Sequence, residues 1–150
     1  MALPILIAAP EDVNLVALEV SETAVTLMKA FWPGALTLVF KKTSFVPDIV
    51  TAGGSTVAVR IAAHPVATAI VRSAGEPLIG TSANIHGKPS PVTAVEVMSQ
   101  IGDKIKLILD AGRTPGGFES TIVDISTDRP RILRQGAVSR VELEKFCLLF

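Results

Sequence analysis

The sequence predicts a mixed α/β domain. Short runs rich in apolar and β-branched residues recur along the chain between glycine, proline and polar residues, as strands do. Segments with helix-capping residues alternate with these runs. The 150 residues are 49% apolar and only 19% charged, so the chain is long enough for one domain with a substantial core and is not disordered.

In the first half of the chain we expect, in order, a strand, two helices and two strands, at residues 3–8, 11–20, 21–31, 36–41 and 56–61. Ser21 is a suitable N-cap for the second helix because its hydroxyl can accept a hydrogen bond from the first helical turn. We expect the segment 32–40, WPGALTLVF, to be structural rather than catalytic, with Trp32 packed against the core.

In the second half we expect a helix, a strand, a helix, three strands and a last helix, at residues 65–74, 78–81, 94–102, 106–110, 121–125, 131–133 and from 140 onward. Capping boxes at Thr93–Glu96 and Ser139–Glu142 predict where two of these helices begin. The order of the strands within the sheet does not follow from periodicity.

Composition excludes several classes of protein. Fourteen basic and fourteen acidic residues balance, so no overall field attracts nucleic acid, although a local basic patch is compatible with this balance. Cys147 is the only cysteine, and His64 and His86 lie far apart in the sequence, so no metal site is predicted from spacing. No stretch approaches the ~20 apolar residues of a membrane helix. A cytoplasmic protein without membrane contact is therefore expected.

Polar side chains stand next to several predicted strands, where an open α/β sheet binds its ligands. They are Arg60, Thr81, Ser82, Asn84, Ser120 and Arg134, the last beside Gly136. Arg60 follows a buried run, so it forms either a structural salt bridge or a site for a carboxylate or phosphate. The small hydroxyl and amide groups are equally typical of turns and caps. Together the groups suggest a site for a small ligand with several oxygen atoms.

Six segments resemble the YrdC-like family and occur in the order seen there: WPGALTLVF (32–40), TVAVRI (56–61), PLIGTSANIHGKPSP (77–91), LILDAG (107–112), STIVD (120–124) and ILRQGA (132–137). The resemblance implies a twisted mixed sheet with flanking helices and a concave ligand-binding face. It also implies a nucleotidyltransferase activity that forms threonylcarbamoyl-AMP from L-threonine, bicarbonate and ATP, for the modification of adenosine 37 in tRNA.

The resemblance further implies the residues of the site. Its ATP contacts correspond to Thr56, Ser82, Ser90 and Arg134, and its threonine contacts to Arg60, Gly80 and Ser120. Asn84 is expected to brace its loop rather than to touch the ligand. No covalent catalytic residue is implied, because the reaction requires positioning and charge neutralisation. Mg²⁺ is expected to accompany ATP, held mainly by phosphate oxygens and water.

The matching segments begin after a threonine-containing segment and a Lys-x-Arg-Pro-like motif of the family. We therefore expect residues 1–150 to form a single YrdC-like domain without the usual N-terminal segment, and with weak or no activity by itself. Two alternatives remain open. One is a non-catalytic module that binds double-stranded RNA or nucleotide, and the other is a YciO-like paralogue with a different acceptor. Partners implied by the main interpretation are tRNA and the machinery that transfers the threonylcarbamoyl group.

Overall fold

A computed structural model describes residues 3–114 and 119–150 of the chain. The chain forms two compact units. The first contains the described residues up to Gly80 together with Glu119–Phe150, and the second contains residues 81–114. A single-domain organisation over residues 1–150 stays a prediction.

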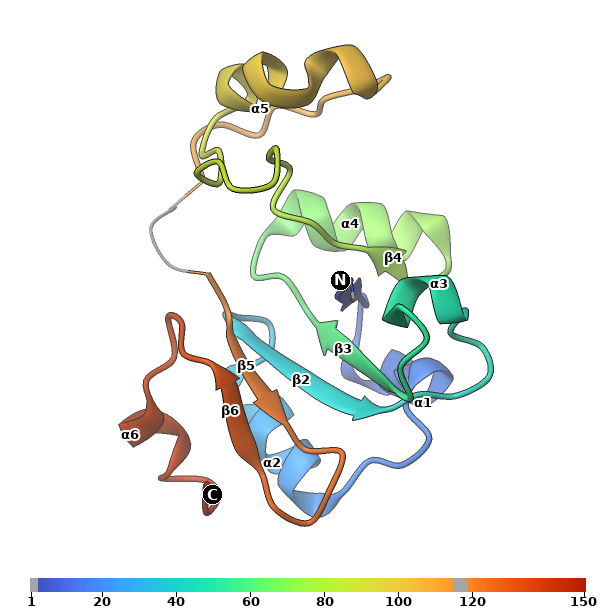
Figure 1. Cartoon of the computed structure of the whole chain (residues 1–150), viewed down its shortest axis with the longest axis vertical. Coiled ribbons are helices and arrows are strands. Elements are labelled where there is room, and N and C mark those ends of the chain that lie inside the picture. Colours follow the sequence, from blue (N-terminus) through green and yellow to red (C-terminus); the bar gives the residue numbers. More distant parts are fainter. Residues whose placement is uncertain (1–2, 115–118) are drawn as a thin grey trace. The chain divides into compact units, whose positions relative to one another are not determined.

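The described part of the first unit is built on a six-stranded mixed sheet (Figure 1). Its strands are β1 (Ile5–Leu6), β2 (Leu36–Lys41), β3 (Thr56–Arg60), β4 (Leu78–Ile79), β5 (Thr121–Asp124) and β6 (Arg131–Arg134). They lie in the order β4-β1-β3-β2-β5-β6. The pairs β1–β3 and β2–β5 are parallel, and the pairs β1–β4, β2–β3 and β5–β6 are antiparallel. The predicted α/β class with a mixed sheet is confirmed.

One face of this sheet forms the hydrophobic core. In β3, Val57 and Val59 are buried while Thr56, Ala58 and Arg60 are only partly buried, so alternate residues face opposite sides. Helix α2 (Glu22–Phe31) buries apolar side chains in the same core cluster. The helical residues of that cluster are Val13 and Val16 of α1 (Val13–Val16), Ala24, Leu27 and Met28 of α2, and Leu143 of α6 (Arg140–Leu143).

Local signals place the helix ends where the sequence predicts them. The Ser21 hydroxyl accepts a hydrogen bond from the Ala24 amide at 3.2 Å and so caps α2. Helix α4 (Pro65–Ala74) begins at a proline and ends at Gly75, whose φ of +72° suits a residue without a Cβ. Ser139 forms the predicted capping box at the start of α6. The remaining short helices of this unit are η1 (Pro10–Asp12) and α3 (Asp48–Thr51).

The second unit contains helix α5 (Ala94–Ile101) and the short helix η2 (Gly102–Lys104). The Thr93 hydroxyl caps α5 by accepting a hydrogen bond from the Glu96 amide at 3.2 Å. The Glu96 carboxylate accepts a hydrogen bond from the amide of Val92 at 2.6 Å, one residue earlier than a capping box requires. The helix start predicted from these residues is correct, although the Glu96 carboxylate bonds the amide of Val92 rather than that of Thr93.

Two element predictions are wrong. The expected helix at 11–20 ends at Val16, because Ala17 forms a bridge with Lys42 and the Leu18 amide bonds the Lys41 carbonyl at 2.8 Å. These backbone hydrogen bonds to the end of β2 replace the ones that would continue the helix. The expected strand at 106–110 joins no ladder in the described ranges, and Leu107 is 73% exposed. Alternation alone cannot make a strand where no sheet edge is available to pair with it.

None of the helices in the described ranges combines the length and the apolar content that crossing a bilayer requires.

Candidate functional site

The second face of the sheet brings together three of the predicted site residues at one edge. Because β2 and β3 are antiparallel, as are β5 and β6, this edge holds the start of β2 and β5 and the end of β3 and β6. Arg60 ends β3, Arg134 ends β6, and Ser120 directly precedes β5. Residues separated by 74 positions along the chain thereby face one surface.

Ser120 is the centre of the hydrogen bonds at this edge. Its hydroxyl oxygen lies 2.8 Å from the Thr37 hydroxyl oxygen and accepts a hydrogen bond from Nη2 of Arg134 at 3.3 Å. The Arg134 guanidinium also donates from Nε and Nη2 to the Ser120 carbonyl, at 3.2 and 3.0 Å. Arg134 forms an ion pair with Glu119 as well. Ser120 is 7% exposed, so its hydroxyl is largely removed from water, whereas the side chains of Arg134 and Glu119 are exposed.

Arg60 is a partly buried cation that lies near Arg134. Its Nε donates a hydrogen bond of 2.7 Å to the carbonyl oxygen of Gly34. Burial lowers the pKa of the Arg60 guanidinium, and the positive charge of Arg134 lowers it further. Arg60 nevertheless stays protonated, because arginine is not deprotonated in proteins. No carboxylate in the described part of the chain forms an ion pair with Arg60.

The backbone turn at Gly34 makes the Arg60 contact possible. A Cβ on Gly34 would overlap the carbonyl oxygen of Phe31, so a side chain cannot be placed there without moving the turn. Trp32 is buried beside it, and its indole nitrogen donates to the Leu36 carbonyl at 2.8 Å. The predicted structural role of this segment agrees with these contacts, which also fix the acceptor for Arg60.

The loop that follows β6 closes against the residues that precede β5. The amides of Gly136 and Val138 donate to the Thr121 hydroxyl oxygen at 2.9 and 3.1 Å, and that hydroxyl donates to the Val138 carbonyl at 2.6 Å. A Cβ on Gly136 would overlap the carbonyl oxygen of Glu119. Gly136 therefore permits the close approach that holds Ser120 against Arg134.

Two further predicted residues of the first unit lie away from this edge. Thr56 begins β3 and pairs with Lys41, so it shares the face of Arg60 but lies about 13 Å along the strand, at ~3.3 Å per residue. The Gly80 amide donates to the Pro4 carbonyl at 2.8 Å, beyond the end of β4. A Cβ on Gly80 would lie 3.0 Å from the side chain of Leu6. The ligand contacts of Thr56 and Gly80 stay predictions.

Ser82 and Ser90 belong to the second unit, where they lie on an exposed loop. Ser82 contacts the side-chain oxygen of Asn84. The Asn84 amide nitrogen donates to the carbonyls of Ile85 and Lys88 at 3.0 and 2.8 Å, which agrees with its expected bracing role. Gln100 of α5 bonds the same loop through the Ile85 amide at 3.0 Å. The ATP contacts of Ser82 and Ser90 stay predictions.

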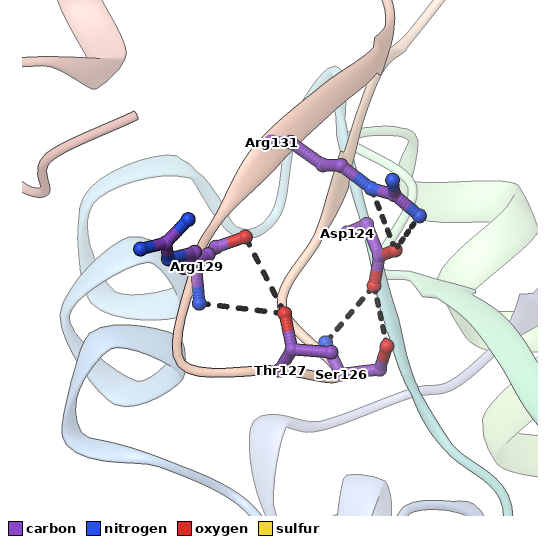
Figure 2. Close-up of polar contacts among 5 residues, drawn as sticks. All are labelled: Asp124, Ser126, Thr127, Arg129 and Arg131. Atoms are coloured by element: carbon purple, nitrogen blue, oxygen red, sulfur yellow. Dashed lines mark hydrogen bonds and ion pairs between the residues drawn. The ribbon is translucent and has the colours of Figure 1, made fainter. Parts of the chain in front are cut away.

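A second polar cluster occupies the hairpin between β5 and β6 (Figure 2). Oδ1 of Asp124 accepts hydrogen bonds from the amide and hydroxyl of Ser126 at 3.0 and 2.6 Å, and Oδ2 pairs with Arg131 at 3.1 Å. Burial opposes ionisation of Asp124, but these hydrogen bonds and Arg131 outweigh it and lower the pKa of the carboxyl. This cluster fastens the hairpin.

A cavity of about 350 Å³ adjoins this hairpin, at the end of the sheet away from Arg60. Lys41, Ser21 and Asp128 are among its lining residues, and none of the predicted site residues lines it. The described geometry therefore supports the site through the cluster at Arg60, Ser120 and Arg134 rather than through this cavity.

Sequence reasoning missed three groups of the site: the Thr37 hydroxyl, the Gly34 carbonyl and the Glu119 carboxylate. Thr37 stands in an apolar strand, and its partner Ser120 is 83 residues away. A threonine inside an otherwise apolar β-run was a signal that could have been read as a buried hydroxyl with a partner. The other two groups carry no local signal, since their partners are set by strand pairing.

Comparison with known proteins identifies similar sequences. A family model for Sua5, YciO and YrdC proteins, described as "Telomere recombination", matches residues 1–136. A threonylcarbamoyl-AMP synthase of Pyrococcus abyssi is 43% identical over 139 residues, covering 93% of this chain and 41% of the relative. The chain thus spans about two fifths of the length of that relative.

Solved structures extend the similarity to the fold. The structure of P. abyssi Sua5 complexed with L-threonine has a TM-score of 0.93 and 43% identity, and the match covers 97% of this chain and 43% of that one. The structure of Escherichia coli YciO has a TM-score of 0.84 and 25% identity, covering 97% of this chain and 69% of that one.

Proposed function

Because the chain belongs to the Sua5, YciO and YrdC family, we propose that it binds L-threonine and ATP and forms threonylcarbamoyl-AMP. The similarity to a threonylcarbamoyl-AMP synthase supports this activity, as does the complex of P. abyssi Sua5 with L-threonine. The observation that carries the proposal is Arg60. It is a partly buried guanidinium without a carboxylate partner in the described ranges, near the guanidinium of Arg134, which itself bonds the Ser120 hydroxyl.

Such an arrangement favours an anion from outside the chain. A partly buried cation is costly unless it is paired, and the charge of Arg134 nearby increases the cost. The planar guanidinium of Arg60 suits a carboxylate, which L-threonine supplies. We assign Arg60, Gly80 and Ser120 to threonine, and Thr56, Ser82, Ser90 and Arg134 to ATP. In this assignment the two ligands meet at Ser120, which bonds both the hydroxyl of Thr37 and the guanidinium of Arg134.

The reaction requires two bond-forming steps. The amine of L-threonine attacks the carbon of bicarbonate, and loss of water leaves an N-carboxylate on threonine. An oxygen of that carboxylate then attacks the α-phosphorus of ATP, and the bond to the β-phosphate oxygen breaks with release of pyrophosphate. The contribution of Arg60 and Arg134 is to hold the reactants together and to neutralise negative charge, without a covalent intermediate on the protein.

The residues around Arg60 do not suit a Mg²⁺ ion held by the protein. Mg²⁺ prefers carboxylate and water oxygens, and the Glu119 carboxylate already pairs with Arg134. Among the described residues, no group of three or more metal-ligating side chains exists. A Mg²⁺ ion would therefore enter with ATP, on phosphate oxygens and water. The product would pass to the machinery that modifies tRNA.

Pyrophosphate release tests the proposal. We expect purified protein to release pyrophosphate from ATP at no more than a weak rate, and only when both L-threonine and bicarbonate are present. Arg60→Ala should lower kcat/KM for threonine by about 10- to 100-fold, as expected for a lost charge-assisted contact. The matched control is Arg72→Ala, which removes an exposed arginine of α4 and should leave the rate unchanged.

Two results would count against this function. ATP binding without any dependence of turnover on threonine would favour the YciO-like interpretation, in which another acceptor is used. Binding of double-stranded RNA with a steep salt dependence, and without nucleotide binding, would favour the non-catalytic module.

A further inference from the structure

The buried hydroxyl of Thr37 determines what Ser120 can offer to a ligand. Thr37 lies on β2 with only 2% of its surface exposed. Within the described part of the chain, its hydroxyl has one hydrogen-bond partner, the hydroxyl oxygen of Ser120 at 2.8 Å. The distance alone does not say which of the two oxygens donates.

The surroundings decide the direction of this hydrogen bond. If Ser120 donated to Thr37, the proton of Thr37 would be buried without an acceptor, which is costly. If Thr37 donates, its proton is satisfied by Ser120. The donor is therefore Thr37.

In the hydrogen bond between Ser120 and Arg134, only Arg134 can be the donor. The guanidinium of Arg134 has no acceptor atom, so Nη2 must donate to the Ser120 oxygen, at 3.3 Å. A hydroxyl oxygen has two lone pairs, and Thr37 and Arg134 occupy both. The hydrogen-bonding capacity that remains to Ser120 is its own proton.

We infer that Thr37 is a positioning residue that orients the Ser120 proton toward the carboxylate of bound L-threonine. The inference rests on the proposed function. Threonine offers a carboxylate as acceptor, an ammonium group as donor and a hydroxyl, and a serine that can only donate excludes the ammonium group. The positive charges of Arg60 and Arg134 favour the carboxylate over the neutral hydroxyl.

Calorimetry with L-threonine tests the role of Thr37. Thr37→Val keeps the shape of the side chain but removes its proton, and we expect it to weaken threonine binding about tenfold, the value of one oriented hydrogen bond. Thr37→Ser keeps the hydroxyl and should restore affinity to within about twofold of the wild type. The matched control, Thr26→Val on the exposed side of α2, should bind as the wild type does.

Two further measurements separate positioning from a general structural effect. Ser120→Ala should weaken threonine binding at least as much as Thr37→Val, and the double variant should bind no more weakly than Ser120→Ala, because Thr37 acts through Ser120. 1-Amino-2-propanol, which keeps the ammonium and hydroxyl groups of threonine but lacks its carboxyl group, should bind equally to wild type and Thr37→Val. If Thr37→Val folds poorly, Ser120→Ala remains informative, because it should weaken binding of threonine but not of 1-amino-2-propanol.

The outcomes are distinct. Wild-type affinity in Thr37→Val, equal losses in Thr37→Val and Thr37→Ser, or additive losses in the double variant would overturn the role of Thr37 while leaving the proposed function intact. A loss of 1-amino-2-propanol binding in Thr37→Val equal to the loss for threonine would overturn the carboxylate assignment. A wild-type protein that binds no L-threonine would overturn the proposed function, and this inference with it.

Discussion

Arg60 and Arg134 lie at the same edge of the sheet but make different contacts. Arg60 uses one guanidinium nitrogen for the Gly34 carbonyl, which leaves the other nitrogens available to a ligand. Arg134 donates hydrogen bonds from Nε and Nη2 to Ser120 and forms an ion pair with Glu119. The two arginines are therefore not equivalent, because Arg60 is the one that lacks a carboxylate partner among the described residues.

Asp124 supports the sheet through its charge, and its removal should be measurable at neutral pH. We expect Asp124→Asn to lower the free energy of unfolding by about 1–2 kcal/mol, because the bonds from Ser126 and the pair with Arg131 lose their ionic partner. The pKa of this carboxyl is lowered on folding, below its ordinary value of 3.8. Its contribution is thus complete above that value and is lost as the pH falls through the folded pKa.

Urea unfolding of wild type and Asp124→Asn at pH 7 and at about pH 2, below the usual range of aspartate pKa values, measures this dependence. The difference between the two proteins should be present at pH 7 and should shrink at the lower pH. A difference that is the same at both pH values would show that the charge of Asp124 does not stabilise the hairpin.

At the scale of the elements, much of the sheet follows from local sequence. The runs LTLVFK and TVAVR form β2 and β3 near the predicted bounds, because alternating or continuous apolar residues between turn signals suit buried strands. The segment 106–110 has a similar pattern and forms no ladder in the described ranges. The difference lies in the availability of a neighbouring edge, which no local pattern contains.

The contact between the loop after β6 and the residues before β5 depends on how two segments pack together, not on a single side chain. Gly136→Ala should push the Glu119 carbonyl away and displace Ser120, since the new Cβ would overlap that oxygen. We expect a loss of about 1–3 kcal/mol in the free energy of unfolding, as for other overpacked sites, together with weaker threonine binding.

Thermal unfolding and threonine calorimetry on the same Gly136→Ala sample check this expectation. Ala137→Gly, which removes a methyl group from the adjacent position, serves as a control for changes in the flexibility of the loop. Full threonine affinity in a Gly136→Ala protein of unchanged stability would mean that this close approach does not position Ser120.

At the scale of the whole molecule, the sequence predicted the class of fold and the residue types of the site, but not how they meet. Arg60, Ser120 and Arg134 were identified from their places beside strands, and the order β3-β2-β5-β6 brings them to one edge. That order, and the bond between Thr37 and Ser120 across 83 residues, depend on long-range pairing. A threonine within an apolar strand indicates a buried hydroxyl with a partner, but nothing in the local sequence identifies that partner as Ser120.

The most direct test of this account is a crystal structure of the protein grown with saturating L-threonine. The account predicts the amino acid on the polar face of the sheet, with its carboxylate against the guanidinium of Arg60 and within hydrogen-bond distance of the Ser120 hydroxyl. L-Threonine bound elsewhere, or bound there with its ammonium group toward Ser120, would contradict it.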